Sequence, residues 1–253
     1  MRPCALVLTL VLTWSTRTMS DPASPKVSHE DGSKKSNRQR KFTPARNFPG
    51  MPGFPPQTVF KQLALELKDK VVFPVDESFH VAILRHNLRT IRFPYVVVYV
   101  DDAQDIKRVL KLGTDHNLMV TIQSSGHSYI GRSTYDGCIQ INLGKMKKRT
   151  VNLNSERNEA GEITVESGNS WLEVYTEVDK IQRVVVGGSA HTVAMGGYTQ
   201  GGGHSPIGRA LGLAVDNLLE ATLVLVDGRV VTVSEKGQVV QVGWLLAWCE
   251  CTS

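Results

Sequence analysis

The sequence predicts an α+β fold of two small lobes, and three observations carry this prediction. A strand, an amphipathic helix and a second strand follow one another within residues 95–123. Two alternating strand patterns come later, at 138–143 and 162–167. A glycine-rich stretch at 187–217 then leads into a hairpin at 221–235. We expect the glycine-rich stretch to cross between the lobes, and a chain of 253 residues is long enough for both.

The first lobe is predicted from its strand–helix–strand unit. YVVVYV (95–100) is a continuous, β-branched apolar run, which is typical of a strand buried on both faces. Asp101 or Asp102 then offers an N-cap. Apolar residues recur after it at helical spacing, at Ile106, Val109, Leu110 and Leu112. LMVTIQ (118–123) is the second strand, and a short helix near Val59 precedes the unit.

The end of the first lobe and the second lobe are predicted from alternating patterns. CIQINL (138–143) and EITVES (162–167) alternate apolar and polar residues, as half-exposed strands do. Ser170 is placed to cap a helix through Ile181. The apolar face of that helix is expected to hold Leu172, Tyr175, Val178 and Ile181.

The last predicted element is a β-hairpin. ATLVLVDGRVVTVSE (221–235) contains two apolar strand patterns on either side of Asp227-Gly228. That dipeptide favours a two-residue type I′ turn, in which both central residues take a positive φ.

The charge distribution argues against a nucleic-acid partner. The formal net charge is +5, and the segment 26–46 alone holds seven Lys and Arg residues against two acidic ones. The rest of the chain is therefore close to neutral. Nucleic-acid binding normally places basic charge on a folded face, so we interpret residues 21–57 as a basic disordered linker.

The first twenty residues predict a signal peptide. Arg2 precedes an apolar run from Ala5 to Trp14, which is too short to cross a bilayer as a helix. No later segment resembles a membrane span, so we expect a secreted, extracellular protein. The four cysteines form no CxxC or Cys/His zinc pattern, and no metal site is predicted.

A polar cluster, SSGHSYIGRS (124–133), directly follows the second strand, where ligands often bind. Two common phosphate-binding patterns, the P-loop and the dinucleotide fingerprint, are compared with the glycine-rich stretch at 187–217. The P-loop pattern is half met by Gly203 and Gly208, but Arg209 and Ala210 replace its lysine and its hydroxyl residue. The dinucleotide pattern begins at Gly201 and meets Pro206 in place of its third glycine. Both are excluded.

Taken together, the two loops resemble the FAD-binding (PCMH-type) domain of the vanillyl-alcohol-oxidase superfamily, and most closely its berberine-bridge-enzyme-like branch. GHSYIGRS (126–133) is similar to the branch's pyrophosphate loop, which carries a flavin-linking histidine. VAMGGYTQGGGHSPIGRALGLAVDNLLEATLVLVDG (193–228) is similar to its second flavin loop and the following strand. The resemblance extends from about Val71 to Glu235, and only the joint pattern is specific.

The resemblance implies FAD as cofactor, with a covalent bond from a ring nitrogen of His127 to the 8α-methyl carbon of the flavin. It implies a cofactor-binding set drawn from both loops and the strand after them: Ser124, Ser125, Gly126, His127, Ser128, Tyr129, Arg132, Ser133, Thr192, Gly196, Gly197, Gly201, Gly202, Gly203, His204 and Val226. Serine hydroxyls and backbone N–H groups of the first loop would hold the pyrophosphate.

Several of these residues have a simpler interpretation. A histidine in a single loop is usually a hydrogen-bonding residue, and only the second loop makes attachment through His127 specific. Tyr129 fits packing better than catalysis. Arg132 fits a phosphate contact and an exposed position equally well. His191 and His204 are interpreted as structural or pocket-lining residues.

The chain departs from the family pattern at two places. Bicovalent members carry a cysteine in G-x-C-x-T-V, whereas GSAHTV (188–193) has Ala190 there, so only a single tether through His127 is expected. After the FAD-binding domain, 58–235 with lobes at about 58–145 and 146–235, the tail 236–253 matches none of the expected features. It resembles the end of a truncated product lacking the substrate domain, and no catalytic residue can be assigned.

Three functions follow from this pattern. The first is an FAD-dependent oxidase that moves a hydride from a small alcohol, sugar or alkaloid-like substrate to FAD and then to O₂. The second is a catalytically inactive, truncated flavin-domain isoform. The third is a secreted basic interaction protein that uses residues 26–46. The oligomeric state is left open.

Overall fold

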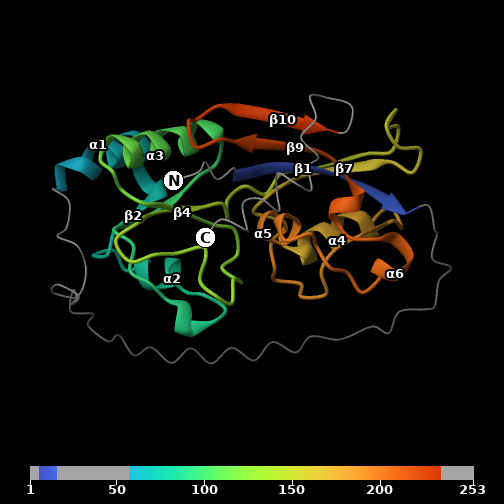
Figure 1. Cartoon of the computed structure of the whole chain (residues 1–253), viewed down its shortest axis with the longest axis horizontal. Coiled ribbons are helices and arrows are strands. Elements are labelled where there is room, and N and C mark those ends of the chain that lie inside the picture. Colours follow the sequence, from blue (N-terminus) through green and yellow to red (C-terminus); the bar gives the residue numbers. More distant parts are fainter. Residues whose placement is uncertain (1–5, 16–56, 235–253) are drawn as a thin grey trace.

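A computed structural model of the chain describes residues 6–15 and 57–234, which form two lobes side by side (Figure 1). Each lobe is a β-sheet with helices packed against it, so the predicted α+β fold is confirmed. The tail 236–253 and the linker 21–57, apart from Gln57, lie outside the described residues. Among the described residues, no helix is both long and apolar enough to cross a membrane.

The first lobe contains a four-stranded sheet in the order β2-β3-β5-β4. Its strands run Val71–Val72 (β2), Val96–Tyr99 (β3), Val120–Gln123 (β4) and Ile139–Asn142 (β5). β3 and β4 both pair in parallel with β5, while β2 pairs antiparallel with β3. The strand–helix–strand unit therefore exists as predicted, with β5 inserted between its two strands.

The helices of the first lobe pack against this sheet. They are Gln57–Leu67 (α1), Phe79–Ala82 (α2) and Ala103–Asp115 (α3), with short 3₁₀ turns at Lys68–Lys70 and Leu88–Thr90. Asp102 is the N-cap of α3, because its carboxylate accepts hydrogen bonds from the backbone N–H groups of Gln104 and Asp105. Ile106 and Val109 of α3 are fully buried in the same core as β3 and β5.

β5 is wrongly predicted as half-exposed. All four of its residues are buried, because it is the inner strand between β3 and β4. Its polar Gln140 tolerates complete burial through two hydrogen bonds: it accepts one from Arg85 and donates one to Gln123, at 3.0 Å. The alternating pattern of this strand therefore reflects a buried polar network and not contact with solvent.

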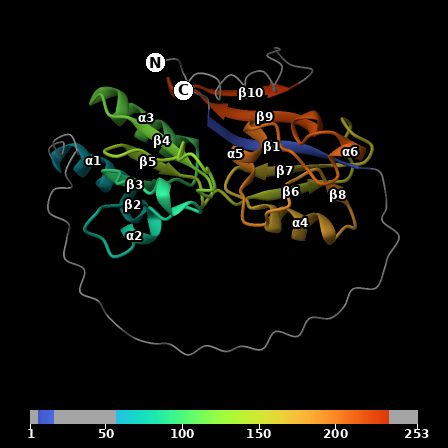
Figure 2. The same cartoon turned by 60° about the horizontal axis from the view of Figure 1, so that its bottom comes forward.

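The second lobe contains a six-stranded sheet in the order β10-β9-β1-β7-β6, with β8 also paired to β1. Its strands run Leu6–Ser15 (β1), Arg149–Asn152 (β6), Glu162–Glu166 (β7), Val184–Val185 (β8), Leu218–Val224 (β9) and Val230–Ser234 (β10). Figure 2 shows β1 in blue between β9 and β7.

β1 is the least expected element, because residues 6–15 belong to the predicted signal peptide. A run of leucine, valine and threonine has high strand propensity, and its composition does not distinguish a leader from a buried strand. Removal of the segment in the cell stays a prediction. In the structure, its backbone pairs with three other strands of the sheet.

The helices of the second lobe are Trp171–Asp179 (α4), Met195–Gln200 (α5) and Gly208–Leu211 (α6), with a 3₁₀ turn at Val215–Asn217. Ser170 caps α4 as predicted, in a capping box with Glu173. The predicted apolar face is partly wrong. Leu172 is exposed, whereas Trp171, Val174 and Val178 are buried against β7 and β9. The true face begins one residue earlier, at the first helical position.

The hairpin between β9 and β10 forms, but its predicted type I′ turn is wrong. Gly228 has a φ of +82°, whereas Asp227 is not among the residues with a positive φ. The Gly228 N–H donates to Leu225 at 2.9 Å, and the Leu225 N–H donates to Arg229 at 2.8 Å. This pattern is a longer turn closed by a left-handed glycine.

Candidate functional site

The fold brings the two glycine-containing loops together, although they lie far apart in the chain. The first loop, 124–133, begins where β4 ends, and the second begins at 188 and continues into α5. The Ala194 N–H donates to the Ser125 hydroxyl at 2.9 Å. A Cβ on Gly196 would lie 2.8 Å from the Ser124 hydroxyl oxygen, so glycine permits this close contact between the lobes.

His127 lies at the centre of this junction. The Thr192 hydroxyl hydrogen-bonds Nε2 of His127 at 2.9 Å, which joins the two predicted loops through two predicted site residues. The His86 ring stacks on the His127 ring with centroids 4.5 Å apart. Partial burial, and then the neighbouring His86, lower the pKa of His127 below its usual value. The imidazole is therefore neutral over a wider pH range than in water.

The first loop offers backbone donors. Gly126 has a φ of +75°, and a Cβ there would lie 2.9 Å from Nε2 of Gln123. Within the described part of the chain, no protein acceptor is recorded for the backbone N–H groups of Ser125 to Ser128. Successive free N–H groups around a left-handed residue form a concavity that suits an anion. The loop has the donors that a pyrophosphate needs.

The glycines of the second loop fall into two groups. Gly196 and Gly203 are buried, and a Cβ on either would meet protein atoms within 3 Å. A Cβ on Gly197 or Gly202 would meet nothing within 4 Å. Gly197 lies inside α5, where glycine costs about 1 kcal/mol relative to alanine. Packing within the described chain does not require a glycine at this position, whereas close approach by a bound ligand would.

A buried cation lies beneath the first loop, and it was missed at the sequence level. Cδ of Arg85 would lie 3.3 Å from a Cβ on Gly126. The Arg85 guanidinium donates to the carbonyls of Leu84 and Ala82 and to Gln140, and burial lowers its pKa to about 10. No described carboxylate forms an ion pair with it. No motif surrounds this arginine in the sequence, so only the fold identifies it.

Other predicted residues lie around or outside the junction. Tyr129 and Arg132 are exposed on the first loop, and the Tyr129 carbonyl accepts from Asn87 at 2.9 Å. The Ser133 hydroxyl is buried and has no hydrogen-bond partner among the described residues. His204 is exposed, and its carbonyl accepts from the Tyr198 hydroxyl.

The remaining members of the predicted cofactor-binding set lie in different parts of the structure. The Ser128 hydroxyl accepts from the Arg132 N–H at 3.2 Å, and Gly201 is exposed at the end of α5. Val226 lies in the turn between β9 and β10, where it lines a shallow depression against Leu110 and Lys111 of α3. Its position is beside α3, and its proposed cofactor contact stays a prediction.

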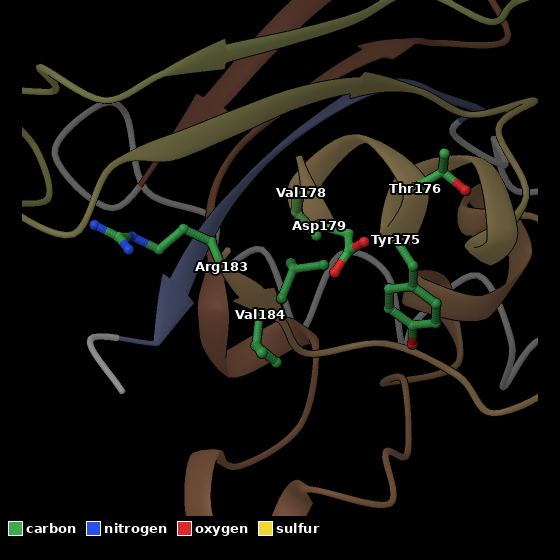
Figure 3. A pocket seen from close by; sticks show the side chains of 7 residues that line it. Tyr175, Thr176, Val178, Asp179, Arg183 and Val184 are labelled. Carbon is green, nitrogen blue, oxygen red and sulfur yellow. The ribbon is translucent and has the colours of Figure 1, made fainter. Parts of the chain in front are cut away.

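The depression shown in Figure 3 is separate from this junction. It has a volume of about 370 Å³ and lies between α4 and β8, lined by residues such as Tyr175, Asp179 and Val184. Arg183 extends away from Asp179 in this view. It shares no residue with either loop. Among the described residues, no group of three or more His, Cys, Asp and Glu side chains could hold a metal ion.

Residues 94–234 match the family model described as FAD binding domain. The chain belongs to this family. The match covers both loops, so the FAD cofactor and the family membership predicted from them are confirmed at the level of a PCMH-type, FAD-linked oxidoreductase. It leaves the roles of individual residues as predictions.

Curated relatives agree with this assignment. The chain is 35% identical over 140 residues to the VAO-type flavoprotein oxidase VAO615 of Thermothelomyces thermophilus, covering 54% of this chain and 24% of the relative. It is 36% identical over 161 residues to the FAD-linked oxidoreductase pgmH of Aspergillus terreus, covering 63% and 32%. The chain thus matches about a quarter to a third of these relatives' length.

Solved structures share the fold. BBE-like 1 of Physcomitrella patens matches with a TM-score of 0.65 and 23% identity, over 70% of this chain and 38% of that chain. MtVAO615 of Myceliophthora thermophila matches with a TM-score of 0.63 and 24% identity, over 76% and 44%. These likenesses agree with a flavin-binding domain that forms part of a larger protein in its relatives.

The geometry of the junction fits FAD. The free N–H groups of the first loop suit a pyrophosphate, and the open surface at Gly197 and Gly202 suits a flat group lying close to the backbone. Sequence reasoning identified both loops, whereas His86 and Arg85 emerged only from the fold.

Proposed function

We propose that this chain is the FAD-binding portion of a secreted oxidase and that it tethers its flavin through His127. The single observation that carries the proposal is the junction itself. The Thr192 hydroxyl engages Nε2 of His127, and the structure records no protein partner for Nδ1 among the described residues. A neutral imidazole with one ring nitrogen available is the nucleophile that attachment requires.

The first loop would bind the pyrophosphate. Its free N–H groups from Ser125 to Ser128 would donate to the phosphate oxygens. The guanidinium of Arg85 lies directly beneath this loop and has no carboxylate partner among the described residues, so none of these carboxylates neutralises its positive charge. A buried cation under an anion site strengthens binding because screening by water is weak there. Arg85 would act through the field and not by contact.

Attachment would proceed from the neutral His127 ring. Nδ1 would replace one hydrogen of the flavin 8α-methyl group, and two protons and two electrons would pass to O₂ to give hydrogen peroxide. Stacked His86 opposes a positive charge on His127, and Thr192 fixes the ring orientation. Ala190 lies where a second tether would need a cysteine, so a single bond is proposed.

The reaction proposed for the whole protein is hydride transfer from a small organic substrate to FAD, followed by reoxidation with O₂. When bound, the flavin supplies the redox chemistry, and the protein orients and tunes it. The substrate class that we propose is a sugar, an alcohol or an alkaloid-like amine. Solved structures with this fold include a chitooligosaccharide oxidase, which supports the sugar. The family match favours this function over a basic interaction protein.

The test is to express the chain, precipitate it with acid and examine the washed pellet for flavin absorbance. We expect a yellow wild-type pellet, a colourless pellet for His127→Ala and a yellow pellet for His116→Ala, a matched histidine at the end of α3. A colourless wild-type pellet would exclude attachment. FAD released into the supernatant would then report binding without a tether.

Secretion is tested separately. We expect the chain to appear in the culture medium of a eukaryotic host with a new N-terminus between residues 15 and 25, read by mass spectrometry. An intracellular chain that retains residue 1 would contradict export.

A further inference from the structure

Two strands of the second sheet, β7 and β9, lie on either side of β1 and do not pair with each other. β7 pairs with β6 on one edge, and β9 pairs with β10 on one edge. Both of their other edges pair with β1, and both are antiparallel to it. Without β1, two adjacent rows of backbone N–H and C=O groups would lose their partners, which is costly where the strands are buried.

Side chains outside β1 also connect these two strands. Arg157 donates to Glu162 of β7 at 3.1 Å and to Glu220 of β9 at 2.9 Å, so one guanidinium bridges two strands that are not neighbours. The strands also share one apolar core beneath the gap, formed by Ile163 and Val165 of β7, Ala221 and Leu223 of β9, and Trp171 of α4. β7 and β9 are therefore connected to each other by side chains outside β1 as well.

We propose that the gap between β7 and β9 is a strand-acceptor site, and that residues 6–15 of this chain are its occupant. The segment is ten residues of apolar and threonine residues, LVLTLVLTWS, which suits a central strand. Its backbone pairs over Thr9–Thr13 with β7 and over Leu6–Leu12 with β9. Main-chain pairing on both sides gives affinity, as in other cases of strand addition.

The occupant has a second predicted fate. Residues 6–15 also form the apolar run of the predicted signal peptide, so strand pairing and export compete for the same residues. A chain that keeps the segment has a closed sheet, whereas a processed chain has lost the proposed occupant of the acceptor site. The two forms of the protein, with and without residues 6–15, therefore differ in whether this segment fills the acceptor site.

The register of β1 gives a direct test in the full chain. Val11 is the Cα partner of Thr164, whereas Thr9 lies two residues further along the strand. Directly opposite Cα atoms in an antiparallel pair lie about 4.5–5.5 Å apart, within disulfide range, while diagonal partners lie at about 7–8 Å. The two double variants are therefore Val11→Cys with Thr164→Cys, and Thr9→Cys with Thr164→Cys as the offset control.

Both are made with Cys4, Cys249 and Cys251 changed to serine, while the buried Cys138 is kept. After mild oxidation we expect at least a tenfold excess of the internal disulfide in the paired variant, measured by mass spectrometry of tryptic peptides. Equal disulfide formation in both variants, or none in the paired one, would overturn the proposal.

A second measurement does not depend on cross-linking. In the full chain, Val11→Pro removes a ladder donor from a central strand, whereas Ser28→Pro lies outside the strand. We expect hydrogen exchange of the β7 and β9 amides to speed up at least tenfold in Val11→Pro only. A synthetic peptide of residues 4–17 with added terminal lysines should restore the protection. Unchanged exchange, or exchange that the peptide does not slow, would contradict strand acceptance.

Discussion

At the scale of single residues, the junction depends on what surrounds His127. The sequence identifies this histidine by its loop, but its chemistry comes from Thr192 on one ring nitrogen and His86 on one ring face. These neighbours come from other segments of the chain. Thr192 orients the ring, while partial burial, and then His86, lower the pKa of His127. Two predictions follow from the lowered pKa of His127.

Replacing the ring that stacks on His127 should shift the pH dependence of flavin attachment. His86→Phe keeps a stacked ring but removes the group that opposes protonation, so the pKa of His127 should rise. We expect attachment to slow several-fold more at pH 5.5 than at pH 8, measured as flavin in acid-washed pellets over time. An unchanged profile, alongside an unchanged His127 titration by NMR, would show that His86 has no electrostatic role.

The same shift should affect stability. The pKa of His127 is lower in the folded protein than its unfolded value of about 6.5, so the unfolded state binds more protons between the two values. Stability should therefore be fully present above pH of about 6.5 and fall as the pH decreases through this window. His127→Gln should flatten that decrease in urea unfolding curves recorded at several pH values. A steeper decrease in the variant would contradict the sign.

At the scale of elements, local patterns predict capped helices well and burial less well. The strand–helix–strand unit and the Ser170 cap of α4 are correct because capping and periodicity are local properties. The half-exposed prediction for β5 fails because the position of a strand in its sheet depends on partners elsewhere in the chain. The turn at Asp227-Gly228 fails for a related reason, since the flanking strands set the loop length.

The Ser170 cap of α4 should contribute measurably to the free energy of unfolding. Ser170→Ala removes the hydroxyl that accepts from the Glu173 N–H and weakens the capping box. We expect a loss of about 1 kcal/mol in the free energy of unfolding. The control is Thr176→Ala, an exposed residue of the same helix whose hydroxyl donates to the Leu172 carbonyl. Equal losses in both variants by urea unfolding would argue against the cap.

The open glycine of α5 provides a test that separates stability from binding. A Cβ on Gly197 meets nothing within 4 Å, so Gly197→Ala should stabilise the FAD-free protein by up to about 1 kcal/mol. The same change should weaken FAD binding at least tenfold if the cofactor lies against this surface. Gly208→Ala, also unobstructed but at the start of α6, is the control. Unchanged affinity, measured by fluorescence titration, would move the cofactor away from α5.

At the scale of the whole molecule, the two lobes meet through the candidate site. The Ala194 N–H of the second lobe donates to the Ser125 hydroxyl of the first, and Gly196 packs against Ser124. A ligand in this junction contacts both lobes, so its binding energy should stabilise them together.

Adding FAD should therefore raise the thermal transition of both lobes. In His127→Ala, where binding is reversible, FAD at 100 times its Kd should add about 2.7 kcal/mol to the free energy of unfolding. Ser125→Ala removes one contact between the lobes and should reduce the affinity for FAD. Differential scanning calorimetry measures the stabilisation by FAD, and titration calorimetry measures the affinity of Ser125→Ala for FAD. Stabilisation of one lobe alone, seen as two separated transitions, would show that the cofactor does not join them.

The sequence by itself determined the α+β class, the capped helices, the two loops and, through their joint pattern, the flavin family. Those features are local, because periodicity, caps and glycine loops depend on residues close together in the chain. Only the tertiary structure decided that His127 meets Thr192, that Arg85 lies beneath Gly126 and that residues 6–15 form the strand between β7 and β9. The physical reason is that these contacts join segments far apart in the sequence. An apolar run shows that a segment avoids water but does not identify the partner that covers it.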